Sequence, residues 1–330
     1  MAGAEPRAPR FPWPALALLA LAGLATLAVS VAVGSVAMSP GQLWGALTGG
    51  GSGLHHDLIF TLRGPRALSA FATGGLLALA GGLMQVLLRN PLADPYVLGL
   101  SGGAAVGALG AMLAGAGTAL VSGSAFAGAL VSTLLVFGLA HGVGGWTPTR
   151  LLLTGVVVAA GWGAVVTFLL TLGPAERLPG MLYWLMGDLT YAGNPGLPWA
   201  VLVVVCLLTV PAGRSLNVLA RGPLQAAALG VSVKPLEALV YVLASLLTAV
   251  AVTTAGSVGF VGLVVPHLLR LVLGNDQRVI LPACVLGGGA LLTLADTLAR
   301  TLMAPQQLPV GVITALLGVP CFLYLLYRSR

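Results

Sequence analysis

Ten apolar runs, separated by glycine, proline and charged residues, follow one another along the whole chain. Most of them reach about 20 residues, the length that a helix needs to cross the hydrocarbon of a bilayer. Lipid admits only helices or closed barrels, because every backbone polar group must be bonded internally. The pattern predicts an all-α polytopic membrane protein with helices at about 15–38, 67–89, 95–116, 121–143, 151–172, 197–212, 235–256, 259–273, 279–303 and 310–327.

Two of these runs differ from the others. The run 259–273 is the shortest and predicts a half-span supported by neighbouring protein. The run 15–38 follows two arginines, as in a signal peptide, but it exceeds the apolar region of about 7–15 residues found there, so we expect a retained first span. The chain is thus divided into a tail at 1–14 and one transmembrane domain at 15–327. The polar intervals 39–66, 173–196 and 213–234 predict loops that contain short helices.

The distribution of positive charge predicts the orientation. Ten crossings place both termini on one side, and that side carries eleven of the fifteen lysine and arginine residues. Positive charge is enriched in cytoplasmic loops, so both termini are expected in the cytoplasm. The opposite, outer side holds the remaining four: Arg63, Arg66, Arg177 and Arg300.

Composition supports a membrane location and excludes several functions. Hydrophobic residues make up 58% of the chain and charged residues 7%, with a mean hydropathy of +1.02. The single lysine, Lys234, precedes a proline and follows no glycine pattern, so the chain has no phosphate-binding loop of a P-loop ATPase. The net charge of +7 forms no basic stripe, so no nucleic-acid partner is indicated. The three cysteines lie in apolar runs and predict no disulfide framework.

Charged residues at the outer ends of helices are the first candidates for chemistry. Arg63, Arg66 and Arg300 either snorkel to the interface or dock an acidic partner. Asp296 and Arg300 are four residues apart on one predicted helix, a spacing that favours a local ion pair. An acid within a span is also a candidate proton relay, so a secondary transporter that uses Asp296 or Asp188 is the competing class of function.

Two inner segments carry further candidates. The run from Arg89 to Pro95 contains two prolines and predicts a rigid turn, either simple punctuation or a constriction of a pathway. The interval 213–234 predicts two short helices broken at Gly222-Pro223, with Gly230 as a C-cap. Such helices lie on lipid or fit a groove of a partner.

Enzymatic and metal-binding motifs are weak. His55 and His56 are adjacent in the first outer loop, and a solvated loop explains them better than metal or haem ligation. No H-E-x-x-H or G-x-S-x-G motif occurs. We therefore expect a transport protein without a cofactor rather than an enzyme.

Several long motifs follow one another in collinear order between about residues 15 and 327, namely Arg63-Gly64-Pro65-Arg66, 81–85 with 90–95, 98–104, 256–267, 296–300 and 308–311. The resemblance is to the iron-chelate, cobalamin and haem permease family, whose members are membrane subunits of type II ABC importers. It implies ten helices per subunit, a second copy of the chain, two ATP-binding cassette subunits, a periplasmic substrate-binding protein and a bacterial inner membrane.

The resemblance also implies roles for individual residues. Arg63, Arg66 and Arg300 match positions that face acidic residues of the binding protein. Arg221, Leu224, Gln225 and Gly230 match coupling helices that dock into the ATPase. Asn90, Leu92 and Thr149 match regions that close the cytoplasmic end of the pathway.

The substrate is the least determined property. Arg177 falls in the outer loop that borders the pathway entrance in this family. An arginine there could pair with the propionates of haem, whereas a pair with the adjacent Glu176 would be purely structural. The expected order of substrates is haem, then a ferric siderophore, then cobalamin.

Overall fold

The computed structural model describes residues 12–34, 36, 38–48, 53–141, 147–190 and 192–328. Within them the chain is helical and contains no strand. The predicted tail 1–14, with Arg7 and Arg10, lies almost wholly outside the described residues. The helices are α1 (Trp13–Ala32), α2 (Pro40–Thr48), α3 (Gly53–Asp57), the π-helix η1 (Leu58–Arg63), α4 (Gly64–Leu87), the 3-10 helix η2 (Pro95–Leu98), α5 (Leu100–Leu113), α6 (Thr118–Ala140), α7 (Pro148–Leu172), α8 (Leu178–Met186), α9 (Gly196–Thr209), α10 (Gly213–Leu219), α11 (Pro223–Ala228), α12 (Val233–Ala255), α13 (Val261–Leu273), α14 (Gln277–Thr301) and α15 (Val310–Arg328).

Each of the ten predicted runs contains a helix, so the all-α prediction is confirmed. Six described helices are long and apolar enough to cross a membrane, and α9 with α10, bent by 70°, makes a possible seventh. The apolar helices α5, α13 and α15 are shorter. Ten is nevertheless too low as a count of all helices, because the polar intervals fold into α2, α3, η1, α8, α10 and α11.

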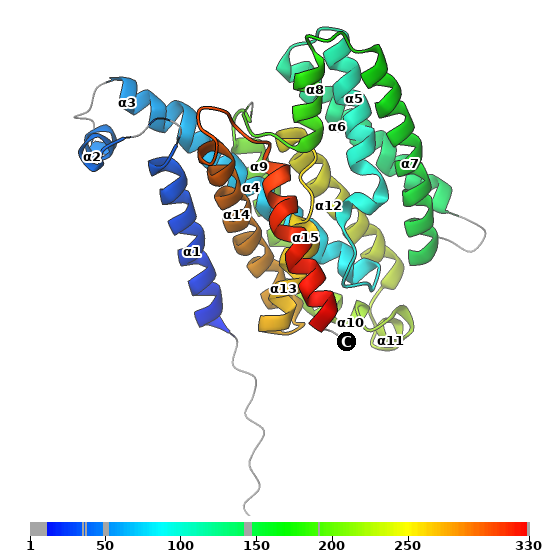
Figure 1. Ribbon diagram of the computed structural model, residues 1–330. Helices are drawn as coiled ribbons and strands as arrows, with labels where there is room; N and C mark the ends of the chain where they lie inside the picture. Colours follow the sequence, from blue (N-terminus) through cyan, green and yellow to red (C-terminus); the bar gives the residue numbers. More distant parts are fainter. Residues whose placement is uncertain are drawn as a thin grey trace, which may run out of the picture.

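The two ends of the bundle differ. Figure 1 shows that α1 begins, and α15 ends, at the end that carries α10 and α11, whereas α2, α3 and α8 lie at the opposite end. We call the end with α10 and α11 the inner end, and the other the outer end, after the predicted orientation. An even number of crossings explains why the first and last helices meet the same end.

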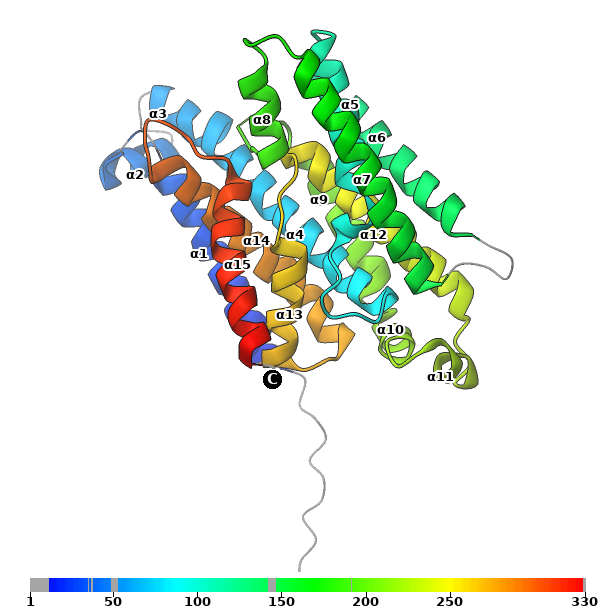
Figure 2. The same cartoon turned by 45° about the vertical axis from the view of Figure 1, so that its right-hand side comes forward.

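Helix α4 is the central element. Almost all of its side chains from Ala67 to Leu87 are buried, and it packs against α12, α13 and α14 (Figure 2). By contrast α1, α7 and α15 expose many large apolar side chains. Exposure of these side chains to water would be unfavourable, whereas contact with lipid or with a second subunit would be favourable.

Glycines allow the backbones around α4 to touch. A Cβ on Gly74 would overlap the carbonyl oxygen of Gly288 on α14, and the reverse also holds. A Cβ on Gly81 would overlap the carbonyl oxygen of Gly262 on α13. In the same way Gly103 and Gly107 of α5 meet the backbone of α6. Close approach through small residues provides dispersion contacts where lipid supplies no hydrophobic drive.

We expect Gly81→Ala to lower the thermal stability of the detergent-solubilised protein. The methyl group meets backbone rather than a movable side chain, and overpacking of this kind costs about 1–3 kcal/mol. Gly138→Ala is the matched control, because nothing lies within 4 Å of its Cβ position and helix propensity favours alanine. Equal unfolding temperatures for the two variants would contradict the close-packing interpretation.

Candidate functional site: a buried charge network and two cavities

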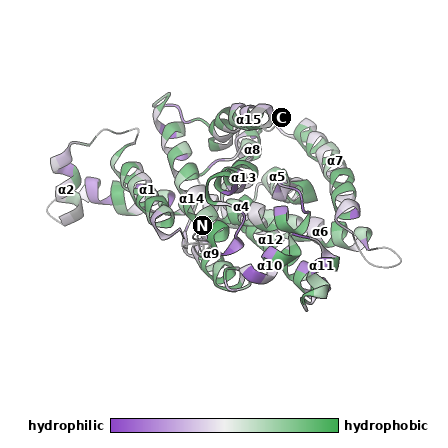
Figure 3. Cartoon of the chain, turned by 90° about the horizontal axis from the view of Figure 1, so that it is seen from below, coloured by the Kyte–Doolittle hydropathy of each residue, from purple (hydrophilic) through white to green (hydrophobic). Residues whose placement is uncertain are grey.

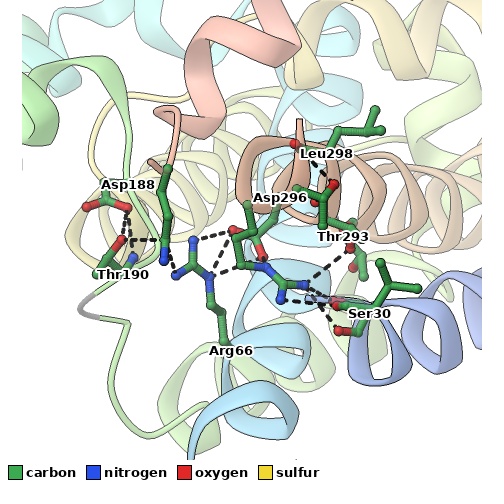
Figure 4. A network of polar contacts seen from close by, with 12 residues as sticks. Ser30, Arg66, Asp188, Thr190, Thr293, Asp296 and Leu298 are labelled. Carbon is green, nitrogen blue, oxygen red and sulfur yellow. Dashed lines mark hydrogen bonds and ion pairs between the residues drawn. The ribbon is translucent and has the colours of Figure 1, made fainter. Parts of the chain in front are cut away.

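The outer end is organised around the carboxylate of Asp296. This side chain is fully buried in α14, and two arginines contact it (Figure 4). Arg66 from the first turn of α4 approaches to 2.8 Å between Nη2 and Oδ1, and Arg300 from the next turn of α14 approaches to 3.0 Å between Nε and Oδ2. The predicted local pair of Asp296 and Arg300 is confirmed, but sequence reasoning missed Arg66 as the second partner.

Arg300 and Arg63 close the end of α1. Arg300 donates from Nη2 to the carbonyl and hydroxyl oxygens of Ser30, at 3.1 and 2.9 Å. Arg63 donates from Nη1 to the carbonyls of Val31 and Ala32, at 3.2 and 3.0 Å. The last carbonyls of a helix lack intrahelical partners and carry partial negative charge. The two guanidinium groups therefore cap α1 at its outer end.

The burial of these arginines bears on their predicted role. Arg63 and Arg300 are each 6% exposed, whereas the side chain of Arg66 retains 14% exposure. In this conformation their donors are directed at groups of the chain itself. Contact of the three arginines with an acidic partner stays a prediction.

The network continues from Arg66 toward the outer surface. Arg66 Nη1 donates to Gln307 Oε1 at 3.0 Å, and the hydroxyl of Thr190 donates to the same oxygen at 3.4 Å. That hydroxyl also lies 2.6 Å from Asp188 Oδ1. Sequence reasoning missed Gln307 and Thr190, because neither belongs to a motif and each sits in a connecting segment.

An outer cavity of about 520 Å³ begins where this network ends. Its described lining comes from the ends of α5, α6, α8 and α12, from the segment between α8 and α9 and from the segment before α15. It includes Tyr183, Asp188, Thr190, Thr253, Thr254 and Gln307. These residues supply hydroxyl, amide and carboxylate groups. No arginine, lysine or histidine is among the described lining residues.

Arg177 lies near this cavity but is bonded to α5. Its Nη1 donates to the carbonyls of Met112 and Leu113, at 2.9 and 2.6 Å, so it caps the C-terminal end of α5. No ion pair with Glu176 occurs within the described ranges, so the expected structural alternative is replaced by a helix cap. A contact of Arg177 with substrate stays a prediction.

The inner end presents the two predicted short helices. Helices α10 and α11 are separated at Gly222, which has φ +123°, and Gly230 follows α11 with φ +80°. Leu224 is 87% exposed, and Arg221 and Gln225 are exposed as well. The break and the glycine cap are confirmed, whereas docking of an ATPase on these residues stays a prediction.

The predicted inner gate is divided between two elements. Asn90 and Leu92 lie in a tight turn in which Asn90 Oδ1 accepts from the Leu92 amide at 2.9 Å. Thr149 is exposed in the first turn of α7. No hydrogen bond joins Thr149 to that turn in the part of the chain that the structure describes.

The two adjacent histidines of the first outer segment lie in the short helix α3. His56 lies 3.9 Å from Asp57 and packs against the ring of Phe60. The described residues contain no group of three or more His, Cys, Asp or Glu side chains that could hold a metal ion.

Comparison with known proteins agrees with this architecture. The pattern of the FecCD transport family matches residues 19–328. The chain is 44% identical over 279 residues to the cobalamin import system permease protein BtuC of Halobacterium salinarum, covering 83% of this chain and 74% of that protein. It is 38% identical over 313 residues to the hemin transport system permease protein HmuU of Yersinia pestis, covering 91% of each.

Solved structures share the fold. An inward-facing conformation of a metal-chelate type ABC transporter superposes with a TM-score of 0.85 at 30% identity, covering 95% of this chain and 98% of that one. PsaBC from Streptococcus pneumoniae superposes with a TM-score of 0.56 at 18% identity, covering 82% and 93%. The second likeness concerns the fold alone.

We expect Asp296→Asn to lower the free energy of unfolding by about 3–5 kcal/mol, because it leaves two mostly buried guanidinium groups without their counter-charge. Thermal unfolding in detergent measures the loss. Asp57→Asn is the control, since that side chain is 75% exposed.

The same variant tests the competing role of Asp296 as an ion-coupling carboxylate. If Asp296→Asn folded like the wild type and lost only gradient-dependent transport, the structural role assigned to the carboxylate would be wrong.

Proposed function

This chain belongs to the FecCD transport family, and we propose that it is the membrane-spanning permease subunit of an ATP-driven type II importer for a metal chelate. The observation that carries the proposal is the family match over nearly the whole chain, on a fold shared with a solved ABC transporter permease. The chain is a transport component rather than an enzyme, and it lacks a phosphate-binding loop of its own.

The inner end would receive the ATPase. Helix α11 presents Leu224 almost fully to solvent, and an exposed leucine on a short helix outside the membrane suits a hydrophobic groove of a partner. ATP hydrolysis would then occur on separate chains, two per importer. In this orientation both termini face the cytoplasm of a bacterial cell.

The outer end would receive the substrate-binding protein. Of the three predicted docking arginines, Arg66 keeps the most exposed side chain, whereas Arg63 and Arg300 hold the end of α1. We therefore assign Arg66 to contact with the partner. Arg63 and Arg300 would hold the outer end of α1 in place beneath the partner.

A second copy of the chain would complete the pathway. The outer cavity shares no lining residue with a cavity at the inner end that Gln85, Arg89 and Arg270 help to line, so these two spaces are not one passage. Helices α7 and α15 expose apolar side chains along their length. Pairing of two subunits is a natural way to enclose a path between them.

The outer cavity favours cobalamin over haem as the substrate. Haem was expected first because of Arg177, but that guanidinium caps α5. The described lining offers hydroxyl and amide groups and the carboxylate of Asp188, which suit the amide groups around a corrinoid ring better than the two propionates of haem. A corrinoid is larger than this cavity, so each of two subunits would supply one wall.

Haem remains the second candidate, because a relative named as a hemin transport permease is similar over 91% of this chain. A ferric siderophore, often anionic, would also find no cationic side chain in the described lining of the outer cavity. The order proposed from the structure is therefore cobalamin, haem and siderophore.

Proteoliposomes that contain this chain, its ATPase and its binding protein should accumulate cobalamin only when ATP is supplied. Uptake of radiolabelled cobalamin, haem and a ferric siderophore, each with and without ATP, measures mechanism and substrate together. ATP-driven uptake of haem instead of cobalamin would contradict the interpretation of the outer cavity. Uptake that follows a proton or sodium gradient without ATP would contradict the importer proposal.

We expect Leu224→Glu to abolish co-purification of the ATPase subunit while leaving the thermal stability of the permease unchanged, because this side chain is 87% exposed and makes no buried contact. Leu54→Glu is the matched control at the outer end, where the leucine is 69% exposed. Retention of the ATPase by the Leu224 variant would place the docking surface elsewhere.

A further inference from the structure

The inner end contains a cationic cavity of about 620 Å³ that the roles above do not explain, although Arg221 in its lining is also one of the residues predicted to dock the ATPase. It is enclosed by the end of α4, by α10, by the end of α13 and by the residues that begin α14. Three arginines line it, namely Arg89, Arg221 and Arg270. Asp276 is the one carboxylate among the described lining residues.

The charge of Asp276 is already compensated. Arg278, which does not line the cavity, holds both carboxylate oxygens, with its Nη2 at 2.6 Å from Oδ2 and its Nε at 3.0 Å from each oxygen. Asn217 donates to Oδ1 at 2.8 Å. The hydrogen bonds from Arg278 hold the pKa of Asp276 well below its usual range, so the carboxylate is ionised and satisfied.

The three arginines of the cavity have no comparable partner. None of them forms an ion pair within the described ranges, and Arg270 donates only to the neutral oxygens of Gln85 and Gly82. Glu237 of α12 interacts electrostatically with Arg89 but does not come within ion-pair distance. Positive charge therefore accumulates in one concave space, which is unfavourable unless an anion enters it.

Two further features of the lining indicate that the cavity is formed to bind a ligand. Arg89 has φ +50°, a conformation that residues other than glycine rarely adopt and that occurs preferentially at ligand-binding positions. Gln277 is 3% exposed, and its Oε1 is buried without a hydrogen-bond partner. An occupant with anionic oxygens and a hydroxyl donor would satisfy both the arginines and this oxygen.

The position of the cavity indicates where such an occupant comes from. Helix α9 exposes Val203, Val204, Leu207 and Leu208, each at least 48%, and α10 turns away from it by 70° at the inner end. Seen from below, hydrophilic residues of α10 lie beside the hydrophobic surface of α9 at the same edge of the molecule (Figure 3). Acyl chains can follow α9 while a headgroup enters beside α10.

We propose that this cavity binds the headgroup of an anionic phospholipid of the inner leaflet, with Arg89, Arg221 and Arg270 contacting its phosphate. Basic pockets between helices at a cytoplasmic membrane surface are suited to such headgroups, and guanidinium groups bind phosphate oxygens in pairs. Phosphatidylglycerol fits best, because its hydroxyls supply the donor for Gln277. The proposal takes from the proposed function only the orientation of the chain.

The test uses the full chain alone in neutral detergent, titrated with phosphatidylglycerol or phosphatidylcholine while thermal unfolding is recorded. Phosphatidylglycerol should raise the unfolding temperature in a saturable manner, and native mass spectrometry should retain it in preference to phosphatidylcholine. In the double variant Arg89→Gln/Arg221→Gln the half-saturating concentration should rise about 25-fold, at about fivefold for each cation removed.

Two control variants accompany the test. Arg214→Gln removes an exposed arginine of α10 that does not line the cavity, and it should change the half-saturating concentration by no more than about twofold. Arg89→Lys/Arg221→Lys keeps the positive charge, and it should retain preference for phosphatidylglycerol. This control shows whether weaker binding by the double Gln variant comes from the lost charge or from misfolding.

Three results would overturn the proposal. One is equal binding of phosphatidylglycerol by the wild type and the double Gln variant. Another is equal protection by glycerol phosphate or inorganic phosphate, which would indicate a site for free phosphate. The third is loss of ATPase association, rather than lipid binding, in the double Gln variant, which would indicate a carboxylate of the partner. Failure of ATP-driven uptake would leave the lipid titration unaffected, because that titration needs neither ATPase nor binding protein.

Discussion

A carboxylate that water does not reach determines how the outer end of this protein is built. Asp296 is fully buried, and an isolated charge at such a depth is very costly. Arg66 and Arg300 neutralise it, and each then requires acceptors for its remaining donors. Ser30 of α1 and Gln307 before α15 provide them. One charge thereby ties together α1, α4, α14 and the segment before α15, and through Gln307 also the segment between α8 and α9, while the middle of the bundle is held by close backbone packing.

The same requirement explains the arginines that depart from the usual distribution of positive charge. Three of the four outer cations donate to carbonyls at the outer ends of helices: Arg63 and Arg300 at α1, and Arg177 at α5. A helix that ends at the membrane surface leaves several carbonyls without partners, and a guanidinium group satisfies two at once. These arginines therefore cap helices whatever else they contact, and a positive residue at the outer end of a helix is by itself weak support for a docking or substrate role.

The features that could be predicted from the sequence are those that depend on residues close to one another along the chain. The ten apolar runs, the break at Gly222 and the pair of Asp296 with Arg300 follow from local composition and helical spacing. The sequence could not predict that Arg66, 230 residues away, completes the charge network, or that Gln307 joins that network to the outer cavity. Those contacts depend on which helices lie side by side, and periodicity carries no information about that. Arg177 was misjudged for the same reason, since its acceptors lie 64 and 65 residues earlier in the chain.

The contact between α4 and α14 has a consequence for movement. Gly74 and Gly288 bring the two backbones into direct contact, and the ion pair between Arg66 and Asp296 joins the same two helices at the outer end. We expect α4 and α14 to move together in any change of conformation, because a shift of one past the other would break the ion pair and the close packing. Helices with freer surfaces, such as α7 and α15, are then the ones that can change position against this pair.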